Sequence, residues 1–380
     1  MVITIINQHA NNFGDEAACI AVLTKLLERK EISEINLMYI GKGIVHFNNK
    51  KVKHNKDVSI KNIGLFHIVS RIFLKKLGYD YRGNKVLKKY LSIIDRSDLI
   101  FVSPAGADLG RYKVWAALLN LYLVNSCDKK IIFHLNTIGT SGSWIFDYYA
   151  NKILRKSRIY VRERKSQRYL NSINIDSTFG VDSAFLLPNS SINKVETKKI
   201  VFIPTQLSVW NKDYKYKDIE GFINDNIILP VIKFSQKHGF EIELLPHLGT
   251  VEERQYYESI ANEYGDAVKI GIAKDVKNVW DYQNHICNSL FVVSMRYHGI
   301  VIAAKNAIPF VSIAYENKMC EVSEYVNMKK QNIEIKCVTY EKLMDLMDYT
   351  LVNLPQIHNR LMCIDDIYKS AERPIRENVK

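Results

Sequence analysis

The sequence predicts an α/β protein made of two domains that face each other across a cleft, each with a parallel sheet covered by helices. Three observations support this fold class. The chain has 380 residues, which is enough for two domains of ordinary size. Its 47% hydrophobic and 24% charged residues are typical of a globular protein and exclude a wholly disordered chain. Short β-branched runs alternate with helical stretches along the chain, as in parallel sheets.

The first half of the chain begins with a strand, a polar turn and a helix. Residues 2–7 (VITIIN) form a β-branched run that ends at the glycine-containing turn HANNFGDEA. The apolar residues that follow keep helical spacing, which predicts a helix over about 16–30. The same alternation continues with strands over 98–103, 130–134 and 157–161 and a helical stretch over 112–123.

The second half repeats this pattern after a polar segment. Residues 188–199 contain almost no large apolar side chains, so we expect a linker there between domains over 1–187 and 200–380. Strands are expected over 200–204, 241–245, 290–294 and 310–314, helices over 222–238, 251–264 and 298–305, and a helical tail at the C-terminus. Both domains are thus predicted to be Rossmann-like, with ligands at the carboxyl ends of the strands.

The positive charge is concentrated in one segment of the first domain. The chain carries a net charge of +13, and residues 42–96, a predicted basic helical insertion, contain 14 Lys or Arg against 3 Asp. Within it, apolar residues recur at helical spacing over 63–77, flanked by basic residues. We expect this stripe to pack on its own domain. The alternative is peripheral contact with an anionic membrane surface.

Several kinds of protein have no support in the sequence. No apolar stretch reaches the length of a membrane span, and no basic segment leads into a signal core, so we expect a cytoplasmic protein. Six cysteines without a CxxC pair indicate reduced thiols. The GxGxxG, GxxxxGK[ST], HExxH and GxSxG patterns are all missing, and so is a tight His/Asp/Glu cluster. We therefore expect neither a bound cofactor nor a metal.

A junction between a strand and a helix in the second half is the best candidate site. Ser294, Arg296 and His298 lie where a strongly apolar strand ends and a helix of small residues begins. Helix N-terminal amides favour a phosphate or carboxylate there, Arg296 can bind it bidentately, and His298 can move a proton. The next strand leads to Lys318 at the same edge of the sheet.

Polar residues also follow strands of the first half. Asn12, Gly14, Asp15 and Glu16 form the first strand-to-helix turn, and Asp108 lies in the loop after a later strand. His134 ends the next predicted strand, and Arg162 follows the one after it. Asp108, His134 and Arg162 are each expected to reach the cleft.

Taken together, these blocks resemble the polysaccharide pyruvyl transferase family. The matching blocks run in order along most of the chain: NNFGDEA (11–17), SDLIFVSPAG (97–106), VRERKSQRYL (161–170), GVDSAFLLP (180–188), LLPH (244–247) and SMRYHGIVIAAKNAIPFVSIAYENK (294–318). The chain departs from the family at 104–108, where members commonly carry a denser glycine run.

The resemblance implies a protein of glycosyltransferase GT-B type that acts in the biosynthesis of a capsule or exopolysaccharide. Such enzymes transfer the enolpyruvyl unit of phosphoenolpyruvate, a co-substrate, to a sugar or a lipid-linked oligosaccharide, usually as a pyruvate ketal. By motif, Arg296 would hold the donor and His298 would be the general acid or base. The further candidates are, for the donor, Arg162, Ser294, Lys318 and His134, and for the acceptor or proton transfer, Asn12, Gly14, Asp15, Glu16, Asp108 and His247.

Two other functions stay open at this point. A nucleotide-sugar glycosyltransferase would have the same architecture. A basic nucleic-acid-binding protein would explain the sequence pI of about 9.2, but the chain lacks aromatic and basic residues interleaved in a recognisable binding motif. We therefore expect no nucleic-acid partner.

Overall fold

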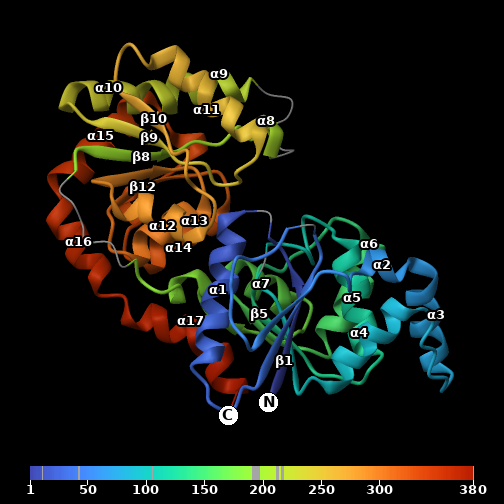
Figure 1. Ribbon diagram of the computed structural model, residues 1–380. Coiled ribbons are helices and arrows are strands. Elements are labelled where there is room, and N and C mark those ends of the chain that lie inside the picture. The colour runs from blue at the N-terminus through green and yellow to red at the C-terminus, as the bar shows by residue number, and fades with distance from the viewer. Residues whose placement is uncertain are drawn as a thin grey trace. The chain divides into compact units, whose positions relative to one another are not determined.

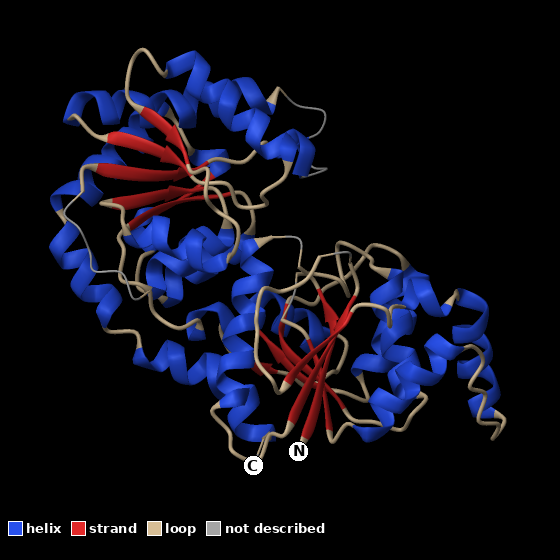
Figure 2. Ribbon diagram, viewed as in Figure 1, coloured by secondary structure: helices blue, strands red, loops and turns tan. Residues whose placement is uncertain are grey.

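The chain consists of two compact units. The computed structural model describes residues 1–10, 12–41, 43–104, 106–190, 197–210, 214 and 218–379. The first unit comprises Met1–Asn11, Asp15–Leu187 and Tyr368–Lys380, and the second comprises Asn12–Gly14 and Pro188–Ile367. Helices lie on both sides of each sheet (Figure 2).

The first unit contains a seven-stranded sheet in the order β3-β2-β1-β4-β5-β6-β7. All its neighbouring strands are parallel. Its strands are β1 (Val2–Gln8), β2 (Glu34–Tyr39), β3 (Val52–Asn55), β4 (Leu99–Val102), β5 (Ile131–Asn136), β6 (Arg158–Val161) and β7 (Thr178–Phe179). Its helices are α1 (Phe13–Leu27), α2 (Ile60–Ile63), α3 (Leu65–Lys76), α4 (Lys85–Arg96), α5 (Trp115–Asn125), α6 (Trp144–Leu154), α7 (Arg164–Ser172) and η1 (Ser183–Leu186).

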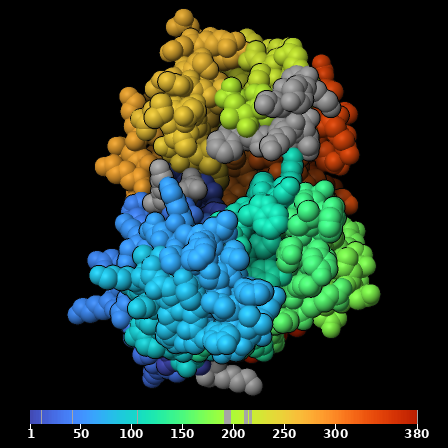
Figure 3. Space-filling model, turned by 90° about the vertical axis from the view of Figure 1, so that its right-hand side faces the viewer, coloured from blue at the N-terminus to red at the C-terminus, as the bar shows by residue number. Residues whose placement is uncertain are grey.

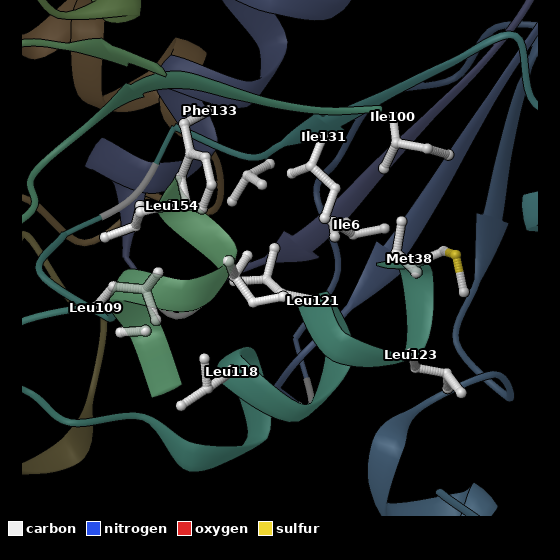
Figure 4. Close-up of a cluster of buried hydrophobic side chains, with 14 of the residues drawn as sticks. Ile6, Met38, Ile100, Leu109, Leu118, Leu121, Leu123, Ile131, Phe133 and Leu154 are labelled. Atoms are coloured by element: carbon white, nitrogen blue, oxygen red, sulfur yellow. The ribbon is translucent and has the colours of Figure 1, made fainter. Parts of the chain in front are cut away.

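The core of the first unit explains why these strands are so apolar. Strand side chains such as Ile6, Ile100 and Phe133 pack with Leu118 and Leu121 of α5 in one buried cluster (Figure 4). Because helices cover the sheet, nearly every residue of β1 is buried, and its β-branched run VITIIN follows from that burial.

The second unit contains a six-stranded parallel sheet in the order β10-β9-β8-β11-β12-β13. Its strands are β8 (Lys199–Ile203), β9 (Glu241–Leu244), β10 (Ile270–Ile272), β11 (Phe291–Ser294), β12 (Phe310–Ala314) and β13 (Asn332–Glu334). Its helices are α8 (Leu207–Trp210), α9 (Ile219–Ile223), the π-helical turn η3 (Asn224–Ile228), α10 (Leu229–His238), α11 (Val251–Tyr264), α12 (Val279–Cys287), α13 (Tyr297–Lys305), α14 (Asn317–Tyr325), η4 (Lys329–Gln331), η5 (Ile335–Cys337), α15 (Tyr340–Val352) and α16 (Leu354–Met362).

Each sheet has one point at which the strand order reverses. In the first unit this point lies between β1 and β4, and in the second between β8 and β11. Loops that leave neighbouring strands there diverge to opposite faces of the sheet, and the crevice between them is the usual ligand site of such sheets. The predicted fold class of two parallel-sheet α/β domains is confirmed.

The C-terminal helix α17 (Asp365–Asn378) packs on the first unit, which differs from the expected second domain over 200–380. Arg158 on β6 donates to Glu377 over 2.6 Å, and Tyr160 donates to the same carboxylate over 2.8 Å. Arg29, just after α1, forms a 3.0 Å ion pair with Glu372 (Figure 1, red beside blue). These contacts join residues more than 200 positions apart, which no local pattern could reveal.

Other boundaries also differ from the expectation. The first helix starts at Phe13 instead of residue 16, and the insertion over 42–96 contains the sheet strand β3 besides helices α2, α3 and α4. Pro188–Ser190, at the start of the expected linker, belong to the second unit, and 191–196 lie outside the described residues. The expectation that the apolar stripe over 63–77 packs on its own domain is wrong, because most of its side chains are exposed.

Candidate active site

A tight turn at the end of β11 presents Arg296. The Ser294 hydroxyl donates to the carbonyl of Arg296 and accepts from the amide of Arg296, each over 2.9 Å. Arg296 is also the N-cap residue of α13, with extended backbone angles. Gly299 leaves space for this turn, because a Cβ there would lie 2.5 Å from Ser294 Oγ. Ser294 therefore shapes the turn that carries Arg296.

The Arg296 side chain lines a cavity of about 290 Å³ at the β8/β11 reversal point. The other lining residues come from the loop after β8 and from the start of α11: Pro204, Gln206, Val209, Thr250, Glu252, Glu253 and Tyr256. Arg296 Nη2 lies 3.6 Å from Glu253 Oε1. The other oxygen of Glu253 accepts from the amides of Leu248 (2.7 Å) and Gly249 (3.1 Å), which fixes the carboxylate beside the guanidinium.

Two histidines stack beside this turn. The ring centres of His247 and His298 are 6.2 Å apart, and the angle between the ring planes is 17°. His247 Nδ1 and the Tyr282 hydroxyl form a 3.2 Å hydrogen bond. Burial holds the pKa of His247 well below its usual value, and the positive charges of Arg296, His298 and Lys318 lower it further. His247 is thus a neutral imidazole next to three basic side chains.

The start of α1 contacts the same histidines within the second unit. The Phe13 amide donates to the His247 carbonyl over 3.2 Å, and the Phe13 ring packs 5.5 Å from that of Tyr282. A Cβ on Gly14 would lie 1.9 Å from Nδ1 of His298. Only glycine leaves room for the His298 ring at this distance from the backbone, so the residue type at position 14 is explained by this contact.

Lys318 approaches from the end of β12, as the sequence predicts. Its ammonium group lies 2.7 Å from the Glu316 carboxylate and 5.5 Å from the centre of the Tyr297 ring. Tyr297 directly precedes His298 in the sequence. The structure therefore brings five predicted residues of the second unit to one edge of its sheet: Ser294, Arg296, His298, Lys318 and His247. Glu253 and Tyr282 belong to the same cluster, and sequence reasoning missed both because neither follows a strand directly.

The reversal point of the first unit holds a His–Asp pair. His9, which follows β1, donates from Nε2 to Asp108 over 2.7 Å. Burial lowers the pKa of His9, but the hydrogen bond and charge of Asp108, together with the charge of Asp15, outweigh this and raise it above the usual value. Asp108 is a predicted site residue. His9 was missed, although its place as the first residue of the turn HANNFGDEA could have indicated it.

The remaining predicted residues of the first unit make structural contacts. Glu16 accepts from the amide and the ring of His46, over 2.8 and 2.9 Å, and so holds the loop after β2. Arg162 is 3% exposed and forms a 2.5 Å ion pair with the buried Asp182. His134 is fully buried, which lowers its pKa to about 4, and lies 3.2 Å from the Ser183 hydroxyl. The structure thus places Arg162 and His134 in the interior of this unit.

The structure describes most of the chain, including every candidate site residue. Within the described residues, no group of three or more His, Cys, Asp or Glu side chains could hold a metal ion. Separately, none of the described helices combines the length and apolar character that a bilayer crossing requires.

Known structures share this fold. The UDP-GlcNAc 2-epimerase from Neisseria meningitidis bound to UDP-GlcNAc is similar with a TM-score of 0.59 at 12% identity, over 99% of this chain and 100% of that chain. Anabaena Alr3699/HepE in complex with UDP-glucose is similar with a TM-score of 0.60 at 11% identity, over 99% of both chains. At these identities the likeness shows the fold, and it supports the predicted GT-B type.

The sequence comparison identifies the family. No curated protein sequence matches the chain. The family model for polysaccharide pyruvyl transferase matches residues 12–317, a span that contains the turn at Gly14 and the junction at Arg296 and His298. This match covers most of the chain and confirms the predicted resemblance. The chain therefore belongs to the polysaccharide pyruvyl transferase family.

Proposed function

We propose that this protein transfers the enolpyruvyl unit of phosphoenolpyruvate to a sugar of a cell-surface polysaccharide, or of its lipid-linked precursor, and forms a pyruvate ketal without a bound cofactor. Family membership supports a transferase of this kind. The observation that carries the proposal is the gathering of Arg296, His298 and Lys318 around the neutral His247. Arg296 and His298 are buried and Lys318 is half-buried, so the cluster can offer positive charge to a small dianion.

The proposed donor site matches the charges of phosphoenolpyruvate. The Arg296 fork suits bidentate binding of a carboxylate or phosphate, and Lys318 supplies a second positive charge. Arg296 is the N-cap of α13, and the first amides of a helix favour an anion. Glu253 keeps the guanidinium in place while the donor is absent. Of this cluster, Arg296 lines the cavity of about 290 Å³ together with Glu252 and Glu253, and the volume suffices for a ligand with so few atoms.

The reaction requires one proton donor and the loss of two hydroxyl protons. His298 would protonate the methylene carbon of phosphoenolpyruvate, which makes C2 electrophilic. One sugar hydroxyl attacks C2 and loses its proton, the C2–O bond to phosphate breaks, and the second hydroxyl closes the ketal. One of the two hydroxyl protons thus restores the proton that His298 gave to the methylene carbon, and the other leaves with the phosphate. Neutral His247 is a candidate proton acceptor, and Asn12, Asp15 and Asp108 are candidates for orienting sugar hydroxyls.

Phosphate release in the presence of a sugar acceptor tests this function. The purified protein is incubated with phosphoenolpyruvate and with free or lipid-linked oligosaccharides, and the mass of the product is measured by mass spectrometry. We expect release of inorganic phosphate and an acceptor mass increase equal to phosphoenolpyruvate minus phosphoric acid. A parallel arm with UDP-sugars tests the glycosyltransferase alternative. Release of UDP, without phosphate release from phosphoenolpyruvate, would contradict the proposal.

A histidine variant connects the activity to this site. His298→Gln keeps hydrogen-bonding capacity but cannot transfer a proton, so we expect a rate loss of roughly 100- to 10,000-fold. His238→Gln is the matched control, because His238 bonds to Asp348 elsewhere in the same unit. Equal rates for the two variants would remove His298 from the chemistry.

A further inference from the structure

Helix α3 turns its apolar stripe toward solvent. Leu65, Phe66, Val69, Phe73 and Leu77 are 63%, 73%, 52%, 60% and 57% exposed. These positions repeat at helical spacing, so they form one continuous strip along the helix. A strip of large apolar side chains that remains exposed on a folded unit indicates an interaction surface.

The orientation of α3 is fixed by its buried arginine. Arg71 is 3% exposed, and it donates to the hydroxyl and the carbonyl of Ser126 over 3.2 and 3.3 Å. It also pairs with Asp80. Ile68 is fully buried on this side of α3. The polar anchor thus faces the unit and the apolar residues face away, which reverses the usual arrangement of a surface helix.

Helix α6 adds exposed aromatic side chains. Trp144, Tyr148 and Tyr149 are 78%, 50% and 43% exposed. Both α3 and α6 contact α5. Figure 3 views the molecule from the side on which the light-blue residues around α3 and the green residues around α6 are both visible. Trp144 follows the loop that leaves the carboxyl end of β5, so this aromatic surface begins at the ligand-binding edge of the sheet.

The segment that carries α3 is strongly basic. Residues 60–96 contain nine Lys or Arg, two Asp and no Glu. Seven of these basic side chains are exposed: Lys61, Lys76, Arg82, Lys85, Lys88, Lys89 and Arg96. Lys76 belongs to the exposed side of α3 itself.

We propose that α3 and its surrounding basic residues dock the protein on an anionic phospholipid bilayer, with α3 lying in the plane of the interface. Phe and Leu side chains would enter the boundary between headgroups and acyl chains, and Trp and Tyr favour the same depth. Lysines near the surface attract anionic headgroups within a Debye length of roughly 8 Å at physiological salt. A second copy of the chain is a poorer occupant, because a symmetric contact would bring two basic segments together.

Vesicle co-sedimentation tests the proposal with the full-length protein. We expect the protein to pellet with vesicles of mixed phosphatidylglycerol and phosphatidylcholine at low salt, and about tenfold less with pure phosphatidylcholine or at high salt. Phe66→Ser combined with Phe73→Ser should weaken binding about tenfold, because two exposed apolar anchors are lost. Replacing Lys61, Lys76, Lys85 and Lys88 with Gln should weaken it as much and remove most of the salt dependence.

Matched controls use exposed residues of the second unit. Val352 and Met362 are 76% and 63% exposed, so Val352→Ser with Met362→Ser removes comparable apolar surface. Replacing the exposed Lys233, Lys274, Lys329 and Lys330 with Gln removes the same charge. Both controls should bind vesicles like the unchanged protein.

Three results would overturn the proposal. The first is failure of the unchanged protein to bind anionic vesicles at low salt. The second is equal binding by the α3 variants and their controls. The third is a dimer of the unchanged protein, seen by sedimentation velocity without lipid, that becomes a monomer in the Phe66→Ser/Phe73→Ser variant. Such a result would assign the strip to a second copy of the chain. The vesicle assay needs neither donor nor acceptor, so its outcome is independent of the proposed reaction.

Discussion

The guanidinium of Arg296 is held before any ligand arrives. The Ser294 hydroxyl bonds to both the amide and the carbonyl of Arg296, and Glu253 lies 3.6 Å from the guanidinium. The side chain is almost buried, so little freedom is lost when it binds an anion. Because the guanidinium is held in one orientation, its contribution to transition-state stabilisation depends on its planar shape as well as on its charge.

Arg296→Lys should therefore lose most activity and keep the fold. The lysine retains the positive charge beside Glu253 but cannot form two parallel hydrogen bonds to an anion. We expect the phosphate-release rate to fall by roughly thirty- to a thousand-fold, which corresponds to about 2 to 4 kcal/mol of transition-state stabilisation. Arg254→Lys, at an exposed position on α11, is the control. Near-normal release by the Arg296 variant would exclude bidentate binding by this residue.

Gly14→Ala tests the close contact between the start of α1 and His298. Alanine is a better helix former than glycine, so without the contact the change would be neutral or stabilising. Because the new Cβ would lie 1.9 Å from the His298 ring, we expect a loss of about 1 to 3 kcal/mol in the free energy of unfolding, measured in urea. In a His298→Ala background the loss should disappear. A loss of the same size in both backgrounds would show that another neighbour is responsible.

At the scale of elements, α13 has two different ends. Its N-terminus carries Arg296 and His298, and its last residue is the buried Lys305. Lys305 donates to Asn189 over 2.9 Å, and burial lowers its pKa to about 8. The helix therefore holds a positive charge in a poorly solvated place at neutral pH, which costs stability.

Lys305→Met should change how stability depends on pH. In the unfolded chain the lysine pKa is near 10.5, and in the folded chain it is about 8, so the unfolded state binds more protons between these values. Stability of the unchanged protein should thus rise with pH over this window, by up to about 3 kcal/mol at roughly 1.4 kcal/mol per pKa unit. The Met variant should lack this rise, as compared by urea unfolding at pH 7, 8, 9 and 10. Exposed Lys233→Met should keep the rise.

At the scale of the whole molecule, the chain leaves the first unit at Leu187 and returns to it at Tyr368. The returning helix α17 buries Ala371 and Ile375 and places Glu377 against Arg158 and Tyr160. The first unit is thus completed by the last residues of the chain, and its stability should depend on them.

Ile375→Ala should destabilise the first unit selectively. Ile375 is fully buried, so the change should cost about 2 to 5 kcal/mol through lost burial and the cavity left behind. Hydrogen exchange should become faster in β6, which α17 contacts, and stay unchanged in β12 of the second unit. The neighbouring Arg376 is exposed, and Arg376→Ala should have little effect. Faster exchange in β12 alone would contradict this account.

The predicted strands and the candidate junction agree with the structure where the signal is local. The run over 310–314 is β12, and the helix over 251–264 is α11, with the predicted bounds. Arg296, His298 and Lys318 were predicted at one edge of a sheet because parallel strands end at the same edge. The edge strands β3, β7, β10 and β13 were missed because each has only two to four residues, and the six-residue strand β2 was missed as well.

The sequence by itself determined the alternation of strands and helices, the two α/β domains and the cationic junction after β11. These features follow from apolar runs and helical spacing within a few residues, which physical burial imposes on any chain of this class. Only the tertiary structure decided which partner each polar residue meets. It placed Arg162 against Asp182, His9 against Asp108 and Arg71 against Ser126. Because Arg71 anchors α3 by contacts to residues distant in sequence, the stripe that periodicity identifies faces solvent instead of the core.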